Sequence, residues 1–291
     1  MNEFTIRDLE NLSGIKAHTI RIWEQRYSFL KPNRTQTNIR YYNNEQLRTI
    51  LNVALLNKYG FKVSSIDRMN EAELRQHILA LNTPEASQDR LISELITCMV
   101  DMESEKFESS LDKYVLTNGI DKTITQIIFP FLDRVGLLWL TSNIIPAQEH
   151  LVSNIIRQKL ISGIEAIHTR TKVNKLVLLF LPEGEHHELG LLYVHYLLKS
   201  QGVKTLYLGA DLPFDDLVFS SRLKKPDFIY THLTSKPKNF HLDAFLTRFV
   251  TNIPHTPLII SGKAAGQPKK DYPSVQLKSS LKEITSFIDA F

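Results

Sequence analysis

The chain has 291 residues, of which 43% are hydrophobic, with 35 Lys+Arg against 31 Asp+Glu and one cysteine. At about 100–200 residues per domain, this length predicts two or three domains. The sequence has no uncharged run of about 18 residues that could span a bilayer, its first residues lack the pattern of a signal peptide, and a lone Cys98 excludes an internal disulfide and a multi-thiolate metal site. We therefore expect a cytoplasmic protein with no membrane partner.

Positive charge is concentrated at the N-terminal end of the chain. Residues 1–62 contain ten basic and five acidic residues, whereas the remaining residues contain 25 basic and 26 acidic ones. A local excess of this kind is typical of a nucleic-acid-binding module, although a few extra surface lysines produce the same imbalance.

The first segment predicts short helices and a hairpin. Thr5 and Asp8 have the spacing of a capping box at the start of a first helix, and apolar periodicity predicts a second helix over residues 16–27. The β-favouring residues 39–42 then predict a two-stranded wing ahead of a third helix. We therefore expect residues 1–75 to form a winged helix-turn-helix DNA-binding domain.

The second helix and the wing carry the candidate DNA contacts, because such a helix can enter the major groove while a wing grips phosphates. The candidates are Lys16, His18, Thr19 and Arg21 on the helix and Arg34, Arg40 and Tyr41 on the wing. The string HTIRIWEQRY at residues 18–27, with Arg40-Tyr41-Tyr42 after it, strongly resembles the MerR family of bacterial regulators. The resemblance implies a dimeric reader of a pseudo-palindromic double-stranded DNA operator. The alternative is an unrelated helical domain with Trp23 in its core.

The rest of the chain changes from helical to alternating patterns. Residues 86–170 show four helical patterns after a linker-like segment at 82–85, which predicts a four-helix bundle. Residues 174–291 alternate apolar strands with helices, beginning with the continuous apolar run at 175–181. This alternation predicts a Rossmann-like (flavodoxin-like), doubly wound parallel sheet, in which ligands bind at the carboxyl ends of the strands.

A polar motif follows the first predicted strand of that sheet. A neutral imidazole at His187 can ligate a metal through one nitrogen while Glu185 holds the proton on the other nitrogen. Gly190 would let a large planar ligand approach the backbone at the start of the next helix. The alternatives are a solvated histidine in a polar loop, or a zinc site in the Glu-His-His-Glu segment.

This motif resembles the Asp-x-His-x-x-Gly signature of cobalamin-binding domains, with Glu185 in place of Asp. The resemblance implies that His187 is the lower axial cobalt ligand and displaces the benzimidazole of the cofactor, whose nucleotide tail enters the domain. It also implies that Thr231, Leu233 and Gly262 lie along that tail. Two positions depart from the pattern, because Thr231 stands where Ser is common and a lysine follows Gly262 where a second glycine is common.

The bundle carries a second signal. Trp139, followed after nine residues by Glu149 and His150, has a spacing shared with the cobalamin-dependent photoreceptor regulators of the CarH and LitR type. The resemblance implies that the indole packs against the 5′-deoxyadenosyl group on the upper face of the corrin, with Glu149 and His150 beside it. The alternative is a tryptophan in the bundle core and a solvated helix start.

These resemblances imply a transcription regulator, not an enzyme, whose operator binding and self-association as a dimer or tetramer are controlled by cobalamin. Adenosylcobalamin acting as a light sensor is the expected form, and methylcobalamin is the alternative. Two other interpretations stay open. One is a corrinoid methyl carrier, which shares the bundle and the cobalt domain, and the other is a MerR-type regulator whose C-terminal domain has lost cobalamin binding and serves oligomerisation.

Overall fold

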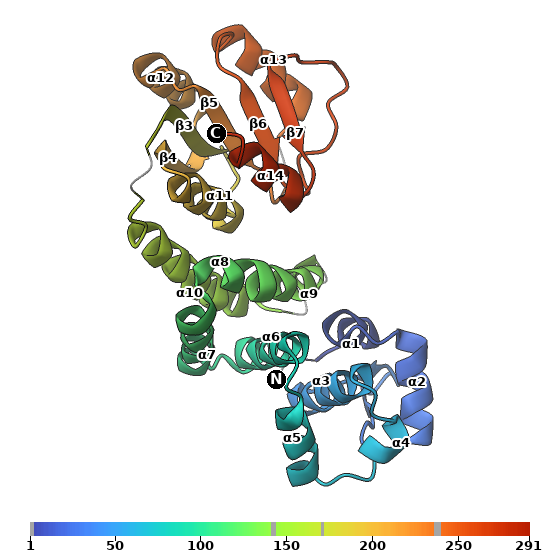
Figure 1. Ribbon diagram of the computed structural model, residues 1–291. Helices are drawn as coiled ribbons and strands as arrows, with labels where there is room; N and C mark the ends of the chain where they lie inside the picture. The colour runs from blue at the N-terminus through green and yellow to red at the C-terminus, as the bar shows by residue number, and fades with distance from the viewer. Residues whose placement is uncertain (1–2, 141–143, 170–171, 236–239) are drawn as a thin grey trace. The chain divides into compact units, whose positions relative to one another are not determined.

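The computed structural model describes residues 3–140, 144–169, 172–235 and 240–291, and the side chains of residues 137–140 lie outside this description. The chain divides into two compact units, Met1–Ile156 and Arg157–Phe291. The first unit is helical with one small hairpin, and the second contains a five-stranded sheet covered by helices (Figure 1). Among the described helices, none has both the length and the apolar character needed to cross a bilayer.

The first part of the first unit, which we call the head, is a winged helix-turn-helix. It contains α1 (Ile6–Ser13), α2 (Ala17–Arg26), β1 (Asn33–Arg34), β2 (Arg40–Tyr41), α3 (Asn44–Lys58), α4 (Val63–Ile66) and α5 (Glu71–Ala80). Capping boxes begin α1, α3 and α5, where the side chains of Thr5, Asn43 and Asn70 accept a hydrogen bond from the backbone three residues later. The predicted helices and wing are confirmed.

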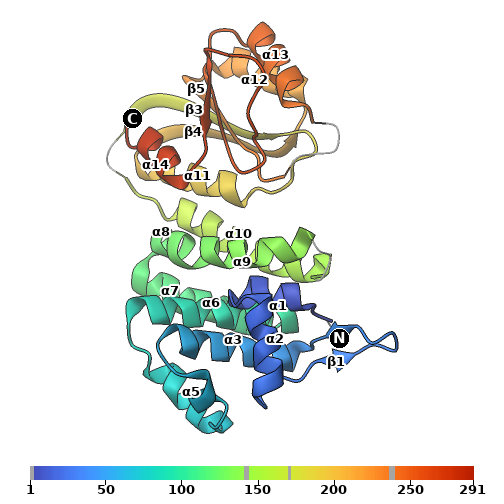
Figure 2. The same ribbon diagram turned by 90° about the vertical axis from the view of Figure 1, so that its right-hand side faces the viewer.

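The helical bundle follows the head. It contains α6 (Pro84–Asp101), α7 (Ser104–Asn118), α8 (Ile120–Thr123), the π-helical turn η1 (Ile124–Ile128), α9 (Phe129–Leu140) and α10 (Pro146–Glu165). In both views, α6 lies between α3 and α9 (Figure 2). The linker expected at 82–85 is wrong in its second half, since Thr83 caps α6 and Pro84 is its first residue. A Thr-Pro pair is as favourable at a helix start as in a loop.

The second unit carries a parallel sheet in the order β4-β3-β5-β6-β7. Its elements are β3 (Val173–Pro182), α11 (Leu189–Ser200), β4 (Val203–Leu212), α12 (Phe214–Lys224), β5 (Phe228–His232), α13 (Leu242–Asn252), β6 (Leu258–Ser261), β7 (Val275–Lys278) and α14 (Leu281–Ile288). Helices α11 and α14 pack on one face, and α12 and α13 pack on the other. The predicted doubly wound fold is confirmed. Because β3 pairs with both β4 and β5, the topological switch point lies at the carboxyl end of β3.

Candidate functional sites

Helix α2 presents its candidate DNA contacts on the side away from the core. His18 and Arg21 are exposed, and half-buried Thr19 has its hydroxyl 3.3 Å from His18 Nε2. Lys16 caps the helix and its Nζ lies 3.0 Å from Glu10 of α1. The start of α2 is therefore polar and positively charged, and Lys16 also ties it to α1.

The wing residues have partners inside the head. Arg34 Nη1 donates to Asn38 Oδ1 at 2.7 Å, which closes the turn between β1 and β2. Arg40 Nε lies 3.7 Å from Glu24 Oε2 and 42% of its side chain is exposed, whereas Tyr41 is half-buried. Both arginines are at the surface, so a phosphate contact is compatible with these intramolecular bonds.

Glu24 connects α2 to the wing, a role that its sequence position did not reveal. Its side chain is buried and accepts a short hydrogen bond from the hydroxyl of Tyr42, which directly follows β2. Burial and the neighbouring carboxylate raise the pKa of Tyr42, so the phenol remains a donor. Because Glu24 also lies beside Arg40, one carboxylate fixes the position of the wing relative to α2.

The loop after β3 holds Glu185 and His187 together. Glu185 is fully buried, and its Oε1 lies 2.6 Å from His187 Nδ1 and accepts a hydrogen bond from the His187 backbone at 3.0 Å. Its Oε2 accepts from the backbone N–H and the hydroxyl of Ser235, beyond β5, at 2.7 and 3.1 Å. Burial alone would raise the pKa of Glu185, but hydrogen bonds from His187 and Ser235 lower it to about 2. The carboxylate is therefore ionised.

The same loop is fixed to strands on both sides of the switch point. Asp211 of β4 accepts from the Gly184 backbone at 2.7 Å and donates its own N–H to the carbonyl of Glu185 at 3.1 Å. When His187 Nδ1 donates to Glu185, Nε2 carries the lone pair that a metal ligand requires, and 45% of this side chain is exposed. The pair would thus supply one imidazole nitrogen as a ligand to cobalt. Within the described ranges, no group of three or more His, Cys, Asp or Glu side chains could hold a metal ion, as a zinc site would need.

Gly190, in the first turn of α11, lies directly against His232. A Cβ added at Gly190 would overlap both Cδ2 and Nε2 of the His232 imidazole. Nδ1 of that ring is 2.8 Å from Ser261 Oγ, which also accepts a hydrogen bond of 2.8 Å from the Tyr230 hydroxyl. Burial lowers the pKa of His232 to about 4, so the ring is neutral. The group that requires a glycine at position 190 is therefore the His232 side chain, which the sequence pattern did not indicate.

The three other sheet candidates lie on or beside the opposite face. Side chains alternate along a strand, so Thr231 shares the α12–α13 face with Ile229 and Leu233, whereas His232 faces α11. Thr231 Oγ1 is buried and has no hydrogen-bond partner among the described atoms, as expected where a ligand supplies one. Gly262 has a φ of 102°, and an added Cβ would overlap the carbonyl of Leu233. Leu233 and Gly262 are therefore in contact.

The bundle candidates lie at the end of α9 and the start of α10. Trp139 is the penultimate residue of α9, and its side chain lies outside the described residues. Glu149 is half-buried and His150 is exposed in the first turns of α10. Next to them, buried Gln148 donates from Nε2 to the carbonyl of Val100 at 2.8 Å. Gln148 therefore ties the start of α10 to the end of α6.

The chain combines a winged helix-turn-helix head, a helical bundle and a parallel sheet with an imidazole–carboxylate pair at its switch point. This combination defines the class of DNA-binding regulators with a B12-binding region. The family model of the MerR HTH family regulatory protein matches residues 4–73, and that of the B12 binding domain matches residues 91–161. The chain belongs to the family of HTH-type transcriptional repressors that includes CarA and CarH of Myxococcus xanthus.

The similarity to these relatives extends over most of the chain. The identity to CarA is 30% over 227 residues, which cover 77% of this chain and 74% of CarA. The identity to CarH is 26% over 269 residues, which cover 90% of this chain and 89% of CarH. Both relatives are transcriptional repressors, which agrees with the expectation from the sequence of a regulator and not an enzyme.

Among solved structures, the monomethylamine corrinoid protein of Methanosarcina barkeri is similar to this chain, with a TM-score of 0.56. The match covers 70% of this chain and all of that protein at 14% sequence identity. At this level of identity the likeness concerns the fold. It supports the bundle-plus-sheet architecture independently of the sequence relatives.

Proposed function

We propose that the chain regulates transcription by binding DNA in a manner controlled by cobalamin, with adenosylcobalamin as the light-sensitive form. In this proposal residues 1–75 bind the operator, residues 86–170 cap the cofactor and residues 174–291 hold it. The observation that carries the proposal is the buried Glu185 bonded to His187 at the switch point of the sheet, in a chain of the CarA and CarH family.

The residues of the sheet would hold the lower side of the cofactor. His187 would coordinate cobalt through Nε2, because Glu185 keeps the proton on Nδ1 and Ser235 keeps Glu185 in place. The unpartnered hydroxyl of Thr231, with Leu233 beside it, is proposed to meet polar groups of the nucleotide tail. Gly262, which contacts Leu233, would line the same path, whereas Gly190 is covered by His232 on the α11 face.

The bundle residues would cover the upper side. We assign the exclusion of water to Trp139 and the orientation of the nucleoside to Glu149 and His150. Adenosylcobalamin supplies a cobalt–carbon bond that light can cleave, whereas methylcobalamin, the alternative form, presents a smaller upper ligand. The position of Glu149 and His150 in the first turns of α10, next to the anchored Gln148, means that a change at the upper ligand would act on a helix end bonded to α6.

The head would read a pseudo-palindromic operator as part of a dimer or tetramer. Lys16, His18, Thr19 and Arg21 are proposed to enter the major groove, and Arg34, Arg40 and Tyr41 to contact the backbone. A coupling free energy of about 1–3 kcal/mol between cofactor and operator would change operator affinity about 5–150-fold.

The test is an absorption spectrum of the purified chain reconstituted with adenosylcobalamin in the dark and after green light. A base-off, histidine-ligated spectrum that changes on illumination is expected, together with a change in operator affinity. His187→Ala should weaken cofactor retention, and the matched control His186→Ala, an exposed neighbour in the same loop, should not. Equal retention in both variants would remove His187 as the ligand, and a light-insensitive spectrum would contradict the sensor.

One observation favours a second candidate function. The imidazole of His232 is packed against Gly190 and bonded to Ser261, so this part of the α11 face is already filled by the chain itself. If this packing excludes the cofactor, the role of the sheet domain would be limited to self-association. In that case the spectrum of the reconstituted protein would show no bound cobalamin, while the head would still bind DNA.

A further inference from the structure

Two aspartates of α6 join the bundle to the head. Asp89, which is 9% exposed, accepts hydrogen bonds from Lys58 Nζ and from the Tyr59 hydroxyl, the latter at 2.7 Å. Lys58 ends α3, and Tyr59 is the cap that follows it. Hydrogen bonds and the charges of Lys58 and Arg134 lower the pKa of Asp89 despite its burial, so the carboxylate is charged.

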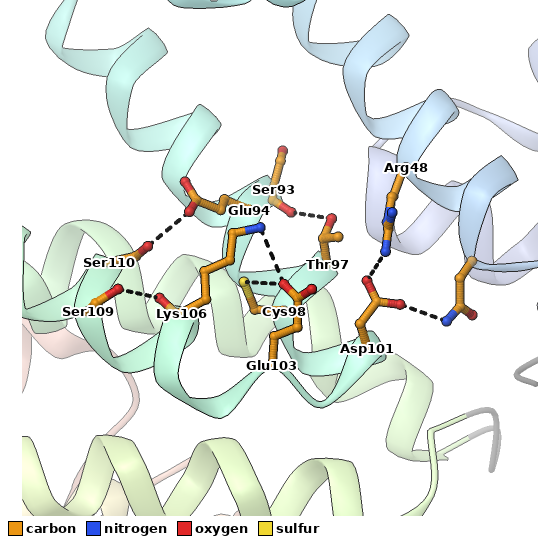
Figure 3. Close-up of polar contacts among 11 residues, drawn as sticks. Arg48, Ser93, Glu94, Thr97, Cys98, Asp101, Glu103, Lys106, Ser109 and Ser110 are labelled. Carbon is orange, nitrogen blue, oxygen red and sulfur yellow. Dashed lines mark hydrogen bonds and ion pairs between the residues drawn. The ribbon is translucent and has the colours of Figure 1, made fainter.

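Asp101, the last residue of α6, makes the second junction. Its Oδ1 accepts from Asn44 Nδ2 at 2.8 Å, and its Oδ2 accepts a short bond from Arg48. Both donors belong to the first turns of α3, and Figure 3 shows Arg48 directed toward Asp101. One helix of the head is thus held at both of its ends by one helix of the bundle.

The bundle helices that carry the proposed upper-face residues contact α6 at the same two places. Arg134 of α9 donates to Asp89 Oδ1 at 3.1 Å, so α9 shares this carboxylate with the head. Gln148 of α10 donates to the carbonyl of Val100, the residue before Asp101, at 2.8 Å. Trp139 follows Arg134 on α9, and Glu149 follows Gln148 on α10. Each aspartate therefore lies one contact away from a helix of the proposed cofactor cap.

We propose that Asp89 and Asp101 form a latch that transmits the state of the bundle to the DNA-binding head. In the docked arrangement, α3 is held through Lys58 and Tyr59 on Asp89 and through Asn44 and Arg48 on Asp101. A displacement of α9 or α10 withdraws Arg134 or shifts Val100, so that the carboxylates lose their positions and the head is released. The role of the latch in cofactor control rests on the function proposed above, but the docking of the head does not.

The contacts of Asp89 have the properties that a two-state junction needs. Asp89 is largely buried, so the loss of one of its donors leaves its charge poorly compensated. Its donors come from α3 and α9, and neither helix alone satisfies both of its oxygens. Exposed ion pairs of ordinary strength would instead contribute little and loosen gradually.

The first experiment tests docking without cofactor. Hydrogen exchange is measured in the full chain for wild type and for the double variant Asp89→Asn/Asp101→Asn, which keeps the shape of both side chains. Amides of α3 should exchange about tenfold faster in the double variant, with no change in the second unit. The control is Asp215→Asn, which removes an Asp–Arg pair of 2.6 Å from the second unit. Unchanged exchange in α3 would refute the latch.

The second experiment separates transmission from docking. Arg134→Gln removes the donor that α9 provides to Asp89 whatever the state of the bundle, so the head should no longer respond to a displacement of α9. The ratio of operator affinities with and without adenosylcobalamin should fall from about fivefold or more toward one. Arg248→Gln, the other half of the control pair, should keep the wild-type ratio.

The outcomes distinguish this proposal from the function on which it rests. If Arg134→Gln binds adenosylcobalamin with the wild-type spectrum and keeps the wild-type ratio, transmission through Asp89 is wrong while the proposed function stands. If wild type itself shows no cobalamin spectrum, the proposed function fails and cofactor control by the latch fails with it. The exchange experiment still decides whether the two aspartates dock the head.

Discussion

Replacing Gly190 by Ala should destabilise the second unit, although the same change in an exposed helix is stabilising. Gly190 is the second residue of α11 and does not have a positive φ, so intrinsic helix propensity favours alanine by about 0.5–1 kcal/mol. Against this gain stands the imidazole of His232, whose ring atoms occupy the place of the new methyl group. The sign of the measured effect therefore reports whether this contact exists.

The steric cost exceeds the propensity gain. Forcing an extra methyl into a packed site costs about 1–3 kcal/mol, and His232 cannot turn away without breaking its 2.8 Å bond to Ser261. The expected net loss is about 1–2 kcal/mol. For a unit of this size, that corresponds to a fall in melting temperature of about 2–8 °C.

Thermal unfolding of the full chain measures this loss, and hydrogen exchange in α11 assigns the transition to the second unit. A double-mutant cycle with His232→Ala isolates the contact, because the alanine removes the ring. In that background Gly190→Ala should be neutral or stabilising. A higher melting temperature for Gly190→Ala alone, or strict additivity in the double variant, would refute the packing of His232 on Gly190.

Three further substitutions test single groups. Burial lowers the pKa of His195 to about 4, below its ordinary value near 6.5, so the imidazole binds a proton in the unfolded chain before it does so in the folded one. The free energy of unfolding should therefore fall by up to about 3 kcal/mol as the pH drops from about 6.5 to about 4. His195→Phe should flatten the pH dependence of the denaturation midpoint over this range, and an unaltered profile would contradict the assignment. Arg40→Ala should reduce the slope of log operator affinity against log salt by about one, whereas an equal slope would leave Arg40 as only a partner of Glu24. Glu185→Gln should weaken cobalamin retention about 10–100-fold while the exposed control Glu183→Gln does not, and equal retention would show that the carboxylate does not support the ligand.

Local signals in the sequence predict much of the fold and part of each site. The capping pair Thr5 and Asp8 lies within one helical turn, and the pair Glu185 and His187 lies within two residues. Such pairs can be recognised because the contacts form wherever the backbone takes its preferred local conformation. The apolar run of β3 likewise predicts a buried parallel strand, since its two faces are covered by helices on both sides.

Contacts between distant segments could not be predicted in the same way. His232 meets Gly190 only because β5 lies next to β3 in the sheet, and Ser235 reaches Glu185 for the same reason. The sequence motif instead indicated Thr231, the residue before His232, whose side chain lies on the opposite face of the sheet. A shift of one position in a strand reverses the side of the sheet, and no local signal distinguishes the two.

Three buried carboxylates show how this chain joins elements that are distant in sequence. Glu24 connects α2 to the wing, Asp89 connects the head to the bundle, and Glu185 connects the loop of His187 to Ser235, beyond β5. A buried charge adds little net stability, but the loss of any one partner is costly. Each junction is therefore close to all-or-none. That property suits a regulator, because an operator-binding state must be either assembled or absent rather than gradually loosened.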